Sequence, residues 1–88
     1  MNGAEVEVYD EFDLHDEEIE GAARLLKALA HPIRLRILCI LGHDEVSVHD
    51  IVTPIGTSQS NISQHLAVMR DKGILSSRKE SNRVLYRI

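Results

Sequence analysis

The sequence has few aromatic residues and almost no cysteine. Of its 88 residues one is Phe, two are Tyr and none is Trp, whereas 43% are hydrophobic. We therefore expect one compact domain with an aliphatic, mostly helical core. The single cysteine, Cys39, excludes an internal disulfide and cannot form a zinc framework by itself. Cysteine usage of this kind favours a reducing cytoplasm.

Long apolar runs are also missing. The longest spans residues 37–41, far short of the roughly 18 residues that a membrane-spanning helix needs. No basic residue precedes an apolar stretch at the N-terminus. We therefore expect neither a signal peptide nor a membrane partner.

Positive charge is absent from the first 20 residues. They contain nine Asp or Glu residues and no Lys or Arg, so all ten basic residues lie further along the chain. The formal net charge of −4 is thus the sum of an acidic segment and a basic domain. We predict an acidic N-terminal arm over residues 1–15 and one domain over residues 16–88.

Two helices are predicted in the first half of the domain. The first begins at a cap on Asp13 or Asp16 and has one apolar stripe. The stripe consists of Ile19, Ala22, Ala23, Leu26, Leu29 and Ala30. The second helix starts at Pro32, which suits the first helical position, and ends at Gly42.

A brief extended piece over residues 44–46, two further helices and a hairpin complete the pattern. Ser47 and Asp50 form a capping box that opens the third helix, which we expect Pro54 and Gly56 to end. A cap at residue 57 or 58 opens the fourth helix. Its inward positions are Ile62, Leu66 and Met69.

The last residues predict a two-stranded hairpin. Residues 74–79 and 84–88 read as strands, and residues 80–83 as the turn between them. Helices three and four then form a helix-turn-helix, with the hairpin as its wing. The predicted fold class is therefore mainly α with a small β-hairpin, a winged helix-turn-helix.

One face of the fourth helix is polar but almost uncharged, which is unusual for a solvated helix surface. Short or forked polar side chains of this kind read base edges in the major groove. The candidate DNA-binding residues on this helix are Gln59, Ser60, Asn61, Ser63, Gln64, His65 and Arg70. For His65 a buried hydrogen-bonding role is the alternative. The cations expected to hold the duplex are Arg70, Lys72, Arg78, Lys79, Arg83 and Arg87.

Several of these segments resemble the ArsR/SmtB family of bacterial winged-helix repressors. Residues 25–38 resemble the family's opening signature, residues 58–66 its recognition helix, and residues 73–75 and 83–86 its wing. The resemblance implies a homodimer that binds double-stranded DNA at an imperfectly palindromic operator. An inducer would release the protein from this DNA. By position, it places Gln59, Ser60, Ser63 and Gln64 on bases or nearby phosphates, and Lys79 and Arg83 on the backbone or minor groove.

The third helix departs from the metal-sensing members. Many of them carry Glu-Leu-Cys-Val-Cys-Asp-Leu there, whereas residues 45–51 of this chain are Glu-Val-Ser-Val-His-Asp-Ile. The missing thiols argue against a thiophilic metalloid. His49 and Asp50, with His15 from the arm, are the remaining candidates for zinc or nickel as an effector. Because adjacent helical residues point about 100° apart, we expect no metal site and no required cofactor.

Cys39 is the remaining sensor candidate. Residues 37–41 resemble the second helix of the metal-independent branch, which includes the haemolysin activator and the biofilm and sulfide repressors. In that branch a cysteine here pairs with one in a last helix that also contributes to the dimer. The sequence ends at Ile88, so we expect that dimerisation helix to be absent. The simpler interpretation, a small buried apolar residue, is favoured for Cys39.

Two rival functions accompany the repressor hypothesis. No nucleophile with a partnered base, phosphate-binding glycine loop or carboxylate pair is evident, so we expect no enzyme. The first rival is a winged-helix protein-interaction module that uses the acidic arm in place of DNA binding. The second is a truncated regulator without a sensing site of its own.

Overall fold

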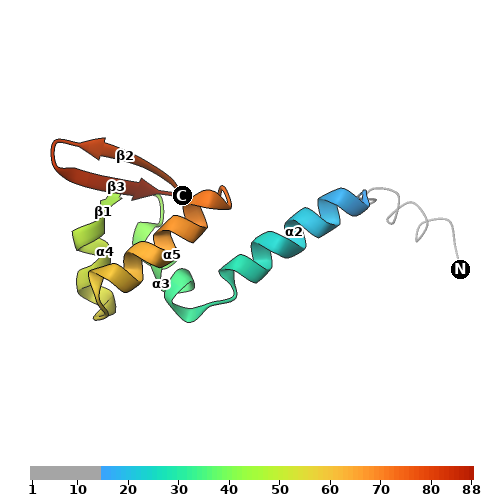
Figure 1. The fold of residues 1–88 in the computed structure, drawn as a ribbon, viewed down its shortest axis with the longest axis horizontal. Helices are drawn as coiled ribbons and strands as arrows, with labels where there is room; N and C mark the ends of the chain where they lie inside the picture. Colours follow the sequence, from blue (N-terminus) through green and yellow to red (C-terminus); the bar gives the residue numbers. More distant parts are fainter. Residues whose placement is uncertain (1–14) are drawn as a thin grey trace, which may run out of the picture.

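The computed structural model describes residues 15–88 (Figure 1). In chain order its elements are α2 (Asp16–Leu29), α3 (Pro32–Leu41), β1 (Val46–Ser47), α4 (Val48–Ile55), α5 (Gln59–Asp71), β2 (Ser76–Glu80) and β3 (Arg83–Arg87). The predicted class is confirmed, because helices dominate and the strands form one small antiparallel sheet. The predicted acidic arm lies outside the described residues, apart from His15. Among the described helices, none combines the length and the apolar character needed to cross a membrane.

Helix α2 extends away from the body formed by the other elements (Figure 1). His15 occupies its N-cap position and makes no side-chain capping bond. The predicted cap at Asp16 is therefore wrong: Asp16 is the first residue inside the helix, where the positive end of the helix dipole favours its carboxylate. The other candidate cap, Asp13, lies outside the described residues.

Most apolar side chains of α2 are largely uncovered. Ile19 is 50% exposed, Leu25 42% and Leu26 68%, whereas Ala28 is the buried residue of the helix. Burial of apolar surface is the main favourable term in folding and association. This helix therefore presents an apolar face that the rest of the described chain leaves open.

The core lies where α3, α4 and α5 meet the sheet. Its members are Ile37, Leu41, Ile51, Ile62, Leu66, Met69, Leu75 and Tyr86. All three residues predicted to face inward from the fourth helix are fully buried. The predicted bounds of the second helix are also confirmed, from Pro32 to a cap at Gly42. An aliphatic core with one aromatic residue therefore anchors α5.

Capping residues define the helix-turn-helix. Ser47 Oγ accepts a hydrogen bond from the Asp50 backbone N–H (3.3 Å), and Ser58 Oγ accepts one from Asn61 (3.1 Å). Between the two helices Gly56 adopts φ 80°, a left-handed conformation that favours glycine. The prediction that Gly56 ends the third helix is confirmed, because Gly56 is the C-cap of α4, whereas Pro54 lies inside the helix, which continues to Ile55. Because proline has no backbone N–H, Pro54 removes one hydrogen bond from the end of α4 without stopping it.

The sheet has three strands in the order β1-β3-β2, and the short extended piece predicted over residues 44–46 is present as β1, Val46–Ser47. Val46 pairs with Tyr86, and Ser47 pairs with Leu85, so β1 covers an edge of β3 that a hairpin alone would leave unpaired. β2 also begins at Ser76, later than predicted. The reason is that the N–H groups of residues 74 and 75 donate to the Met69 carbonyl at the end of α5.

Candidate nucleic-acid interface

Helix α5 separates a buried apolar side from an exposed polar row. Its buried residues, including Leu66, fix the helix on the core. The exposed row consists of Gln59, Ser60, Ser63 and Gln64. These side chains offer amide and hydroxyl groups, which can both donate and accept hydrogen bonds. The residues predicted to contact bases therefore share one solvent-facing surface.

The start of α5 and the wing meet around one cleft. The cleft has a volume of about 220 Å³ and is lined by Ser47, Val48, His49, Gln59, Asn82, Arg83 and Val84. It brings together Gln59 and Arg83, which are far apart in sequence. Arg83 lies 3.9 Å from a carboxylate oxygen of Asp50, and both side chains are about 60% exposed. Such an exposed pair is weak, so Asp50 holds the Arg83 guanidinium only loosely.

Other predicted contact residues occupy different positions. Lys79 is exposed on β2, and Arg70 is exposed in the last turn of α5. Arg70 lies roughly 17 Å along the helix from Gln59, too far to share its base pair. Asn61 is half-buried and donates from its amide to Thr57 Oγ1 (3.2 Å). Asn61 therefore braces the first turn of α5.

His65 faces the body of the protein rather than the exposed row. Its Nδ1 accepts a hydrogen bond from Arg34 Nε (3.1 Å), and its ring lies 4.5 Å from that of His31, measured between centroids. Arg34 also donates to the Ala28 carbonyl (2.8 Å). The structure thus places His65 in the alternative role, a half-buried hydrogen-bonding residue. Arg34 joins the end of α2 to the recognition helix through it.

This cluster makes stability depend on pH. Burial, aided by His31 and Arg34, lowers the pKa of His65 below its ordinary value of 6.5. The unfolded chain therefore binds the proton at a higher pH than the folded chain, and the stabilisation is lost as pH falls from about 6.5 through the folded-state pKa. We expect the urea midpoint to fall between pH 7 and pH 5, and to fall less in His65→Gln, whose amide oxygen keeps an acceptor. An equal fall in both proteins would exclude this cluster as the cause.

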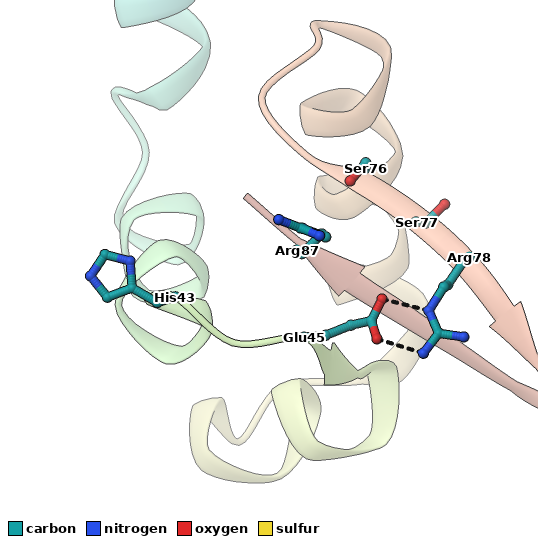
Figure 2. A pocket seen from close by; sticks show the side chains of 6 residues that line it. All are labelled: His43, Glu45, Ser76, Ser77, Arg78 and Arg87. Carbon is teal, nitrogen blue, oxygen red and sulfur yellow. Dashed lines mark hydrogen bonds and ion pairs between the residues drawn. The ribbon is translucent and has the colours of Figure 1, made fainter.

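Arg78 was expected to hold DNA, but it is ion-paired within the protein (Figure 2). Its guanidinium makes two hydrogen bonds of 2.7 Å with the carboxylate of Glu45, and a third of 3.0 Å with Glu80. The hydrogen bond from Arg78 holds the pKa of Glu45 below its ordinary value. Arg78 therefore links the wing to the segment that precedes β1, and its positive charge is already compensated within the protein.

The sensor and metal candidates are accessible but scattered. Cys39 is exposed, so the prediction that it is a buried apolar residue is wrong. Its position on α3 turns the thiol outward, while Ile37 and Leu41 on either side face the core. His49 and Asp50 are exposed near the start of α4. Within residues 15–88 no three His, Cys, Asp or Glu side chains come together to hold a metal ion.

Sequence reasoning missed two contacts that organise this region. Arg34 and His65 are 31 residues apart, and Arg78 and Glu45 are 33 apart. Neither pair has a local spacing that a helix or strand pattern could reveal. Both depend on how α3, β1 and the wing are placed in the folded chain.

A winged helix-turn-helix with an exposed polar recognition row and a basic wing defines a class, the DNA-binding transcriptional regulators. The family model described as "Bacterial regulatory protein, arsR family" matches residues 31–77. The chain belongs to this arsR family.

Individual relatives agree with this assignment. The chain is 49% identical over 70 residues to the HTH-type transcriptional regulator YgaV of Escherichia coli, covering 78% of this chain and 71% of YgaV. It is 41% identical over 73 residues to the biofilm growth-associated repressor of Xylella fastidiosa, covering 83% of this chain and 64% of the repressor. The structure of HlyU from Vibrio cholerae superimposes with a TM-score of 0.81 at 40% identity, covering 84% of this chain and 80% of HlyU.

Proposed function

We propose that this protein is a sequence-specific repressor that acts as a homodimer on an imperfectly palindromic operator. We place it in the cytoplasm and assign it no enzymatic role. The observation that carries the proposal is the cleft around which Gln59 and Arg83 meet. A recognition helix in the major groove and a wing on the adjacent backbone require this arrangement. A relative that is named a repressor, from Xylella fastidiosa, supports the direction of regulation.

The dimer rests on α2 in this proposal. The exposed Ile19, Leu25 and Leu26 form an apolar strip on a helix that projects from the body. A twofold axis beside this strip would bury the same residues of both copies. Binding to successive major grooves requires this dimer to hold its two recognition helices about 34 Å apart, one turn of the DNA. The wing and the start of α5 lie on the body, away from α2 (Figure 1), and stay free for DNA.

Arg83 tests the DNA contact directly. Replacing Arg83 by Ala should weaken DNA binding and reduce the slope of log affinity against log salt by about one, because one phosphate contact is lost. Arg78→Ala is the matched control, since Glu45 and Glu80 already hold that charge, and its slope should stay near that of the unmodified protein. Fluorescence anisotropy measured from 50 to 300 mM salt gives the slope for each variant and so distinguishes them. An affinity that changes neither with salt nor on replacement of Arg83 would favour the protein-interaction module.

The trigger we propose is oxidation or persulfidation of Cys39, because its thiol is exposed. Oxidant or persulfide should then release DNA from the unmodified protein and leave Cys39→Ser bound, as followed by a mobility shift. A metal effector predicts the opposite pattern, in which zinc or nickel releases DNA and His49→Ala abolishes that release. Release by oxidant that persists in Cys39→Ser would contradict the thiol trigger.

A further inference from the structure

The guanidinium of Arg34 bridges the end of α2 and the recognition helix. Its Nη1 donates to the Ala28 carbonyl in the last turn of α2 (2.8 Å), and its Nε donates to His65 Nδ1 on α5 (3.1 Å). Because a guanidinium is planar and rigid, it makes both hydrogen bonds only when the two helices keep a fixed separation. The ring of His31, in the connection between α2 and α3, packs against the ring of His65. Side chains from three segments therefore meet at the junction of α2 with α5.

The direction of α2 depends on contacts near its C-terminal end. The helix projects from the body and joins it there (Figure 1). Two residues, Ala30 and His31, connect it to α3, and Ala28 is its buried residue. Its 14 residues make it roughly 21 Å long, so a tilt of about 10° at its base moves its far end by roughly 4 Å. The Arg34 bridge lies at this base.

The position of α5 depends on different contacts. Ile62, Leu66 and Met69 are fully buried in the core and hold the helix on the body. Losing the Arg34 bridge would therefore leave α5 in place. It would free the direction of α2 relative to the recognition helix.

The bridge requires a neutral His65. A neutral imidazole has one nitrogen that accepts, whereas a protonated one donates from both nitrogens, so protonated His65 cannot accept from Arg34. Its new charge would also lie beside two basic groups, Arg34 and His31. Within residues 15–88, neither Arg34 nor His65 forms an ion pair. The other charged side chains of α2 and α5 on this side of the junction are Glu20, Arg24, Lys27, Asp71 and Lys72.

We propose that this bridge is a pH-sensitive link between the dimer helix and the recognition helix, and that protonation of His65 breaks it and releases the protein from its operator. The inference rests on the proposed dimer through α2. Successive major grooves require recognition helices about 34 Å apart, and a free α2 no longer fixes that spacing. A single half-site does not depend on the spacing, so its binding should survive protonation.

Binding to two duplexes at pH 7.5 and pH 5.5 tests the link. The first comes from upstream of the protein's own gene, and the second is the same duplex with one half of the operator scrambled. Affinity of the full-length protein for the first should fall about tenfold on acidification, because each protomer must lose a proton to bind both halves. Affinity for the second should stay constant or rise, since added positive charge favours phosphate binding.

Three variants separate the link from other effects of pH. His65→Asn places an amide oxygen near the position of Nδ1 and does not titrate, so it should keep its operator affinity at pH 5.5. Arg34→Lys presents a single ammonium that cannot bridge two acceptors, so it should bind the operator weakly even at pH 7.5 and leave half-site binding unchanged. His43→Asn is the matched control, because His43 is exposed and outside the junction, and it should keep the tenfold fall. An equal fall in the unmodified protein and His65→Asn, or on both duplexes, would overturn the proposal.

A distance measurement tests the link without DNA. Spin labels on Glu18→Cys in α2 and Thr53→Cys in α4, both exposed positions, are introduced with Cys39→Ser into the full chain. Dilution with unlabelled protein restricts the measured distances to one protomer. The distance distribution should widen between pH 7.5 and pH 5.5, and it should stay narrow when His65→Asn is added. A distribution that is the same at both pH values would overturn the link. The absence of any operator preference at pH 7.5 would instead count against the repressor proposal, and the labels would still decide on the link.

Discussion

Replacing Gln59 and Gln64 together by alanine should reduce affinity for the operator at least about thirtyfold. Both side chains are exposed on α5, and they are the two amides in its polar row. A glutamine that makes two hydrogen bonds to adenine contributes about 1 to 3 kcal/mol of discrimination. Two lost contacts therefore cost at least about 2 kcal/mol, with each 1.4 kcal/mol worth a factor of ten. The measurement is a mobility shift on DNA from upstream of the protein's own gene.

The same variant should bind scrambled DNA as tightly as the unmodified protein does, because Arg83 and the other cations remain. Alanine is a strong helix former, so the circular dichroism spectrum should show α5 intact. An equal loss of affinity on operator and scrambled DNA would mean that these amides contact the backbone. Such a result would show that α5 does not read bases through these two side chains.

Replacing Leu26 by Glu should weaken the proposed dimer at least about a hundredfold. Leu26 is 68% exposed on α2, so the substitution leaves the core of each protomer untouched. Burying a leucine side chain contributes about 1.5 to 3 kcal/mol, and twofold symmetry removes two of them at once. Sedimentation velocity at micromolar concentration should show a monomer with an unchanged helical spectrum.

Leu26→Met is the matched control for this variant, because methionine is an apolar side chain of similar volume. It should remain a dimer. A dimer that persists in Leu26→Glu would show that α2 does not form the interface. The loss of dimer with full retention of operator affinity would contradict the twofold mode of DNA binding.

The helix-turn-helix was predictable from sequence because its signals are local. Capping serines, the glycine in the turn and the inward spacing of Ile62, Leu66 and Met69 each depend on residues within about one helical turn. The structure confirms all of them. The errors occurred where non-local structure decides. The short strand β1 was predicted, but its pairing with β3 was not, because the two lie far apart in sequence. Cys39 is exposed because α3 turns it away from the core.

The candidate site was predictable in residue type but not in electrostatics. A row of glutamine and serine on one helix face is visible in the sequence, and the structure exposes it. Arg78 and Arg83 look equivalent in the sequence, yet Glu45 holds the first at 2.7 Å and Asp50 approaches the second only to 3.9 Å. His65 follows the polar row directly but turns toward Arg34. Such differences arise from partners more than 30 residues away, which no local pattern contains.

The measurement that tests the central claim most directly is a salt titration of binding to two duplexes, one from upstream of the protein's own gene and one of the same length with scrambled sequence. A repressor that reads bases through α5 and holds phosphates through its wing should prefer the first duplex by about a thousandfold or more. Its affinity for both should fall steeply with salt. Equal affinity for the two duplexes, or affinity that does not change with salt, would contradict the account.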